Sequence, residues 1–166
     1  MNKYKYLTQG PYADCQIITA INAGIFLGLP GVKQKSIEYE RLIDLGACRH
    51  GAAISIERVI NYLGLQRKRI PYSLKSFSVS LSKYRPVELC LWNKDFGYHS
   101  CLLIGMYHNE IETKLKIINY NKEKNKTIFL STEVNSKEND KSWRHFKAYE
   151  FSKSRFNYFK DWKFKP

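Results

Sequence analysis

The chain has no long hydrophobic run. None of its 166 residues belong to a stretch approaching the roughly 20 consecutive apolar residues that a membrane-spanning helix needs, so we expect no membrane span. The first ten residues, MNKYKYLTQG, lack the continuous apolar segment of a secretory signal peptide. We therefore expect a cytoplasmic protein, and the host cytoplasm if a virus encodes it.

The cysteines lack the spacing of a metal site. There are four (Cys15, Cys48, Cys90 and Cys101), and no two of them stand two residues apart as in structural zinc sites. Without a secretory signal, the thiols are expected to be free in a reducing compartment. We predict no metal ion and no other cofactor.

Acidic residues are scarce. The 28 Lys and Arg residues outnumber 15 Asp and Glu, which gives a formal net charge of +13. Such an excess favours an acidic partner, which can be nucleic acid, an anionic membrane surface or an acidic protein. The alternative is that a Lys- and Asn-rich composition reflects AT-rich coding. A hydrophobic content of 43% and this length indicate one globular domain with its own core.

Helical periodicity dominates the first half of the chain. Asp14 is a suitable N-cap for a helix that begins at Cys15 and ends near Gly28. A second helix is expected from Ser36 to Leu45, with Ile37, Leu42 and Ile43 facing inward. A third is expected from Ser55 to Gly64, and a short helix or turn from Leu74 to Ser82.

Short strands are expected after Pro86. They cover residues 87–92, 100–107, 114–119 and 127–130, and a polar loop follows over 131–142. Aromatic and basic residues are interleaved in the last segment, FSKSRFNYFKDWKFKP (151–166). This pattern suits either a final strand or a segment whose aromatic rings stack on nucleic-acid bases, and we favour the strand. Helices followed by antiparallel strands predict an α+β fold, with a core over about 7–130 and an extension over 131–166.

Cys15 is a candidate nucleophile because of its expected place at a helix N-terminus. A free thiol has a pKa near ~8.5, and the unpaired N–H groups and dipole of a helix start favour the thiolate. The same N–H groups can hold an oxyanion, and the side chain of Gln9 can supply a second donor. The alternative is that Cys15 is a small buried residue.

A thiol nucleophile needs a base, and the candidates are His50, His99, His108 and His145. Only His99 opens an apolar strand. If strands 100–107 and 114–119 form a hairpin centred at 109, His99 pairs with Asn119; a centre at 110 pairs it with Asn121. Either carboxamide would lie on the same face and could hold one imidazole nitrogen, which leaves the other for the thiol.

The ordered set of Gln9, Cys15, His99 and Asn119 resembles the papain-like cysteine peptidases. Within that group it is most similar to the bacteriocin-processing, double-glycine type and its stand-alone relatives. The similar segments, over about residues 7–122, are Asp14-Cys15, GAAISIERVINYLGLQRKRI, RPVELCLW, HSCLLIGMY and LKIINYN.

The resemblance implies a papain-like fold, in which N-terminal helices pack on a C-terminal antiparallel sheet and a short strand follows the Gly64-Leu65 helix stop. It also implies a peptide or protein substrate and assigns the roles: Cys15 as nucleophile, His99 as general base, Asn119 as orienting residue and Gln9 as oxyanion donor. The chain departs from the family at Gln16-Ile17, where Gly-Pro is usual, and at Asn119-Tyr120, where Asp-Pro is usual.

Other functions remain open at this stage. The same constellation serves deamidation and acyl transfer. A different class is a non-catalytic basic module that binds nucleic acid or an acidic host protein, with Cys15 incidental. The small size and basic, Asn-rich composition also fit a factor from a virus or mobile element that targets a host protein.

Overall fold

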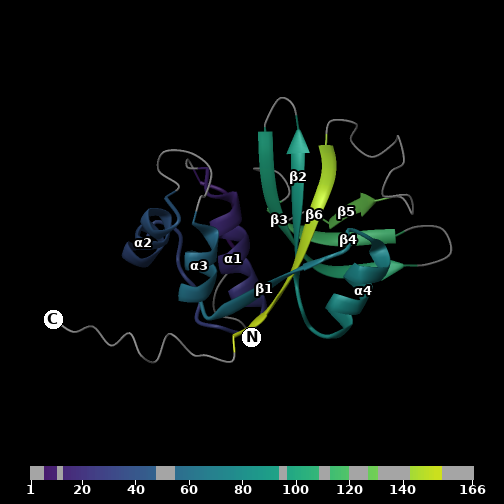
Figure 1. The fold of residues 1–166 in the computed structure, drawn as a ribbon, viewed down its shortest axis with the longest axis horizontal. Coiled ribbons are helices and arrows are strands. Elements are labelled where there is room, and N and C mark those ends of the chain that lie inside the picture. The colour runs from purple at the N-terminus through teal and green to yellow at the C-terminus, as the bar shows by residue number, and fades with distance from the viewer. Residues whose placement is uncertain are drawn as a thin grey trace.

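The chain folds into four helices and one six-stranded sheet over the residues described by the computed structural model, which are 6–10, 13–47, 55–93, 97–108, 113–119, 127–130 and 143–154 (Figure 1). The helices are α1 (Cys15–Phe26), α2 (Ile37–Leu45), α3 (Ile56–Tyr62) and α4 (Leu74–Ser82). The strands are β1 (Leu65–Ile70), β2 (Val87–Asn93), β3 (Gly97–His108), β4 (Thr113–Ile118), β5 (Thr127–Leu130) and β6 (Trp143–Lys153).

The sheet is antiparallel throughout, in the order β1-β6-β2-β3-β4-β5. This mixture of helices and antiparallel strands agrees with the α+β prediction. The last strand in sequence, β6, lies between β1 and β2, and its Ala148 and Phe151 are fully buried. The prediction that the core ends near residue 130 is therefore wrong. Periodicity along the chain could not show that the residues of β6 pair with residues 50 to 88 positions away.

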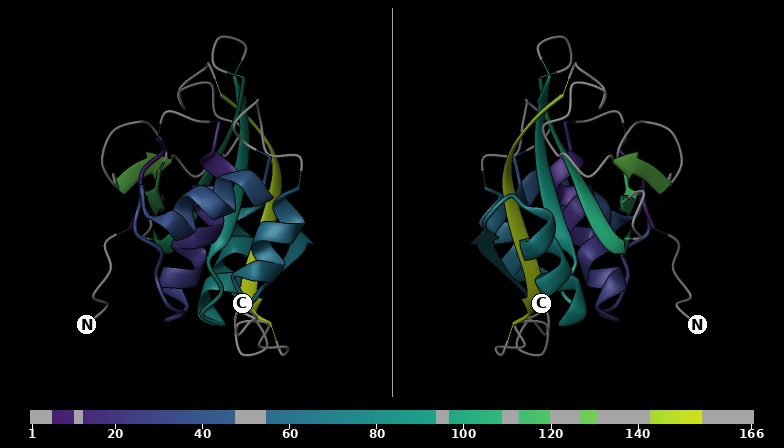
Figure 2. Two further views of the ribbon diagram at one scale, coloured as in Figure 1. Left: turned by 90° about the vertical axis from the view of Figure 1, so that its left-hand side faces the viewer. Right: turned by 90° about the vertical axis from the view of Figure 1, so that its right-hand side faces the viewer.

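Helices cover both faces of the sheet (Figures 1 and 2). On one face, α1, α2 and α3 form a core with side chains such as Leu65, Leu102 and Phe151. On the other face, Phe77 of α4 packs against residues that include Leu89 and Leu103. The helix α1 makes its main contact with the sheet at β3. The start of α1 is thus held against the strand that carries His99.

The sequence predicted most helix boundaries well, but not every inward-facing residue. Ser36 caps α2 because its hydroxyl accepts a hydrogen bond from the Tyr39 N–H at 3.2 Å. Leu42 and Ile43 are buried as expected, whereas Ile37 is 86% exposed. Tyr39 takes the inward position in the first turn, since it lies three and four residues before Leu42 and Ile43. None of the helices in the described ranges has the length and apolar character required to cross a membrane.

Candidate active site

Cys15 is the first residue of α1, and its surroundings keep the thiol protonated. Only 6% of the residue is exposed. Burial is the main influence and raises the thiol pKa to about 12; the nearby carboxylates of Glu88 and Asp14 act in the same direction. The backbone N–H groups of Ser100 and Gln16 donate to the sulfur and oppose this shift without cancelling it. The expectation that the helix start lowers the pKa of Cys15 is therefore wrong for this conformation.

Asp14 occupies the N-cap position of α1, but its carboxylate does not cap the helix. It accepts hydrogen bonds from the Gly10 N–H at 3.3 and 3.4 Å and from the Tyr39 hydroxyl. Burial raises the pKa of this carboxyl, although these hydrogen bonds counteract the rise. Asp14 thus ties Gly10, in the segment before α1, to Tyr39 of helix α2.

His99 is buried, and Asn119 holds its imidazole ring through a backbone atom. The ring Nε2 lies 2.6 Å from the carbonyl oxygen of Asn119. Because a carbonyl oxygen only accepts hydrogen bonds, Nε2 carries the proton and Nδ1 is the basic nitrogen of the neutral ring. The expected bond between the Asn119 carboxamide and the imidazole is absent from the hydrogen bonds of the described residues.

The backbone conformation of Asn119 explains this difference. The pairs Leu102–Ile118 and Leu103–Ile117, which are the pairs nearest His99, place the centre of the hairpin at residue 110 rather than 109. A register shift between Leu103 and Gly105 moves the centre to between residues 110 and 111 for the pairs nearer the turn. The strand ends at Ile118, and Asn119 turns away with a φ of 61°, a left-handed conformation that asparagine tolerates. This turn brings its carbonyl group to His99. Asn121, the alternative partner, lies outside the described residues.

The side chain of Asn119 joins the N-terminal segment to β3. Its Oδ1 accepts a hydrogen bond from the backbone N–H of Gln9 at 2.8 Å, and its Nδ2 donates to the Ser100 carbonyl at 3.4 Å. Gln9 is partly buried, and its backbone is therefore fixed beside His99. Hydrogen bonds thus join Gln9, Asn119 and His99, and Cys15 is linked to this group through the backbone of Ser100, the residue after His99.

The remaining histidines do not join this group in the described structure. His108 lies at the exposed end of β3, where its Nδ1 is 2.8 Å from the Thr113 hydroxyl oxygen. His50 falls outside the described residues. The backbone of His145 lies in β6, and its place opposite Leu91 is all that the structure describes.

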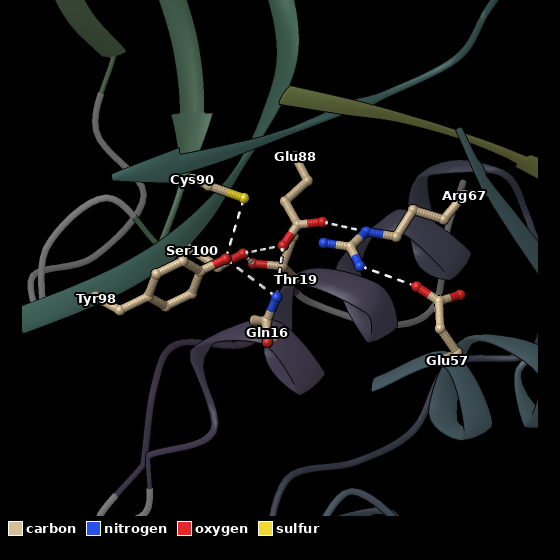
Figure 3. Close-up of polar contacts among 8 residues, drawn as sticks. All are labelled: Gln16, Thr19, Glu57, Arg67, Glu88, Cys90, Tyr98 and Ser100. Carbon is tan, nitrogen blue, oxygen red and sulfur yellow. Dashed lines mark hydrogen bonds and ion pairs between the residues drawn. The ribbon is translucent and has the colours of Figure 1, made fainter. Parts of the chain in front are cut away.

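Sequence reasoning missed a buried polar cluster beside Cys15 (Figure 3). We call it the Glu88 cluster; it consists of Gln16, Thr19, Arg67, Glu88, Cys90, Tyr98 and Ser100. At its centre, the Glu88 carboxylate accepts bonds from Arg67 at 2.8 Å and from the Ser100 hydroxyl at 2.8 Å. A sequence signal did exist, because Glu88 is a charged residue inside the apolar segment VELCLW, where a buried charge needs a partner.

The ion pair of Arg67 and Glu88 is almost completely buried. Their side chains are 7% and 2% exposed, and the Arg67 guanidinium also lies 3.7 Å above the ring of Tyr149. A second carboxylate, Glu57, contacts the same guanidinium at 3.0 Å but is 66% exposed. Glu88 is therefore the counter-charge on which the buried guanidinium depends.

No group of three or more His, Cys, Asp or Glu side chains in the described ranges is placed to bind a metal ion. The comparisons with known proteins found no matching family model, no matching curated protein and no matching solved structure. The chemistry of the site is therefore argued from its own geometry.

Proposed function

We propose that the chain is a cysteine-dependent hydrolase with a papain-like fold, that it cleaves peptide bonds, and that Cys15 is its nucleophile. The observation that carries the proposal is a chain of contacts near the junction of α1 and β3: Gln9 and His99 are both hydrogen-bonded to Asn119, and the Asn119 side chain is bonded to Ser100, whose backbone acts on the Cys15 thiol. These residues are up to 110 positions apart in sequence. A helix that begins with cysteine and packs on an antiparallel sheet also supports the papain-like arrangement.

The roles follow from the hydrogen bonds. His99 donates from Nε2 to the Asn119 carbonyl, so Nδ1 is the basic nitrogen of the neutral ring, and we assign it the role of accepting the proton of Cys15 as the sulfur attacks a substrate carbonyl. Because the resting thiol is neutral, deprotonation accompanies the attack. The N–H groups at the start of α1 and the amide of Gln9 stabilise the oxyanion, and water then releases the acyl group from the sulfur. Deamidation and acyl transfer would use the same steps with another leaving group or acceptor.

We expect iodoacetamide to alkylate Cys15 at pH 7 to 8 at least ~10-fold faster in the wild type than in His99→Ala, since a general base contributes about 10²- to 10⁴-fold. The base accepts the thiol proton as the S–C bond forms and iodide leaves. The advantage should disappear on acidification, because a protonated imidazole accepts no proton. In His99→Ala the rate should keep rising well above pH 9, in line with the raised pKa of Cys15. Peptide mapping would separate Cys15 from the other cysteines.

His108→Ala is the matched control, because His108 is on the same strand and outside the site. It should leave the alkylation rate of Cys15 unchanged. Equal rates in the wild type and His99→Ala would contradict the proposed hydrolase. The burial of Cys15 and the charge of +13 would then favour the basic binding module. That module should bind nucleic acid with a steep salt dependence, unaltered by Cys15→Ala.

The part played by Asn119 has its own test. Since the backbone carbonyl holds His99, Asn119→Gly should retain most of the His99-dependent alkylation, because glycine adopts a φ of 61° readily and keeps the carbonyl. Asn119→Val should lose it, since a β-branched residue is strained at this φ. If Asn119→Gly were as slow as His99→Ala, the side chain rather than the carbonyl would orient the imidazole.

A further inference from the structure

The side chain of Gln16 connects the candidate nucleophile to the Glu88 cluster. Gln16 follows Cys15 in the first turn of α1, and its backbone N–H donates to the Cys15 sulfur. Its Nε2 lies 3.3 Å from Glu88 Oε1 and 3.1 Å from the Tyr98 hydroxyl. This position departs from the papain-like peptidases that the chain resembles, in which glycine is usual.

The chemistry of the two partners fixes the orientation of this carboxamide. Glu88 is paired with Arg67 and offers only acceptor oxygens, so the Gln16 atom that faces it must be the donor Nε2. The Tyr98 hydroxyl donates to Cys90 Sγ at 3.0 Å, so its oxygen is left to accept from Gln16. A flipped amide would place its oxygen against the carboxylate. The carbonyl oxygen Oε1 is thus forced to the opposite side.

Figure 3 shows this oxygen turned away from Glu88 and Tyr98. Gln16 is partly exposed, and its side-chain hydrogen bonds to other described residues all use Nε2. The result is a hydrogen-bond acceptor held in one orientation on the residue next to Cys15. The ion pair of Glu88 with Arg67 and the hydroxyl of Tyr98 keep it there.

We propose that Gln16 is a substrate-binding residue whose Oε1 accepts a hydrogen bond from an amide N–H of the compound that reacts at Cys15. The inference rests on the proposed thiol hydrolase and names a residue that would select amide substrates for it. Secondary amides, such as peptide bonds, supply the N–H donor beside the reacting carbon. Esters, thioesters and tertiary amides do not, and they would leave the Gln16 oxygen without this hydrogen bond.

Two matched alkylating agents test the proposal. 2-Iodo-N-methylacetamide has one amide N–H, and 2-iodo-N,N-dimethylacetamide has none. After division by their rates with free N-acetylcysteine, the first should alkylate Cys15 of the wild type about 3- to 10-fold faster, the effect of one hydrogen bond. Gln16→Met has a similar volume without the acceptor, and it should bring this ratio to about 1. Tyr98→Phe removes one anchor of the carboxamide and should give an intermediate ratio.

Gln66→Met is the matched control, since Gln66 is an exposed glutamine on β1. Its ratio should equal that of the wild type. If the two reagents alkylated wild-type Cys15 at the same normalised rate, or if their rate ratio were unchanged in Gln16→Met, the role proposed for Gln16 would be overturned. The hydrolase proposal would still hold in that case if the alkylation of Cys15 depended on His99. If Gln16→Met abolished the rate difference between the two reagents but His99→Ala did not slow alkylation, Gln16 would be confirmed as a hydrogen-bond acceptor and the hydrolase proposal would be rejected. An unreactive Cys15 would overturn both.

Discussion

A chain that ends at Ser142 should fail to fold, although it keeps every residue of the proposed site. The truncation removes β6, which pairs with β1 on one side and β2 on the other, and with it the buried Ala148 and Phe151. The buried phenylalanine alone contributes about 1.5–3 kcal/mol, and two hydrogen-bonded ladders are lost as well. A domain with a net stability of about 5–15 kcal/mol does not tolerate such a loss.

The measurement is urea unfolding followed by near-UV circular dichroism. The shortened chain should show no cooperative transition, whereas a control chain that ends at Ser154 retains all of β6 and should unfold cooperatively. A cooperative transition of the 142-residue chain, with the urea dependence of the longer one, would mean that β6 is not part of the core.

The second large effect is expected at Glu88. Glu88→Ala leaves the Arg67 guanidinium buried without its counter-charge and removes the acceptor of the Ser100 hydroxyl and of Gln16. Breaking a buried ion pair from one side typically costs about 3–5 kcal/mol, because the remaining charge cannot return to water. Equilibrium urea unfolding of the variant should therefore show a reduction of this size in the free energy of unfolding.

Glu57→Ala is the matched control, since Glu57 binds the same guanidinium from a largely exposed position. Its cost should stay within about 1 kcal/mol. The double variant Arg67→Met/Glu88→Leu should recover much of the stability lost in Glu88→Ala, because it leaves no unpaired charge in the interior. Equal costs for Glu88→Ala and Glu57→Ala would show that solvent reaches Arg67 and that the Glu88 cluster does not depend on charge pairing.

Stability and the proposed chemistry are linked through this cluster. Glu88 holds the carboxamide of Gln16, and its charge also helps to keep the Cys15 thiol protonated. The deeply buried carboxylate that stabilises Arg67 therefore also shapes the surroundings of the candidate nucleophile. When the thiol is neutral, the reaction rate depends more strongly on His99 in the proposed mechanism. The base must then take the proton during the reaction rather than before it.

The sequence by itself determined the local elements. The helix over 74–82, the start of α1 at Cys15 and the strand that begins at Val87 follow from periodicity, caps and breakers, which act over a few residues. The register arithmetic left hairpin centres at 109 and 110; the structure has 110 for the pairs nearest His99, and a register shift that the arithmetic did not include changes the pairing nearer the turn. The residue types of the candidate site were also visible, because cysteine, histidine and asparagine have few equivalents in the proposed chemistry.

Only the tertiary structure decided how these elements meet. The insertion of β6 between β1 and β2, the turn of the Asn119 carbonyl toward His99 and the pairing of Glu88 with Arg67 all join distant segments. The pKa of Cys15 belongs to the same group, because it depends mainly on burial and also on the carboxylate of Glu88, which lies on a distant strand. Local propensities are set by neighbours along the chain, whereas burial, strand order and charge pairing are set by neighbours in space.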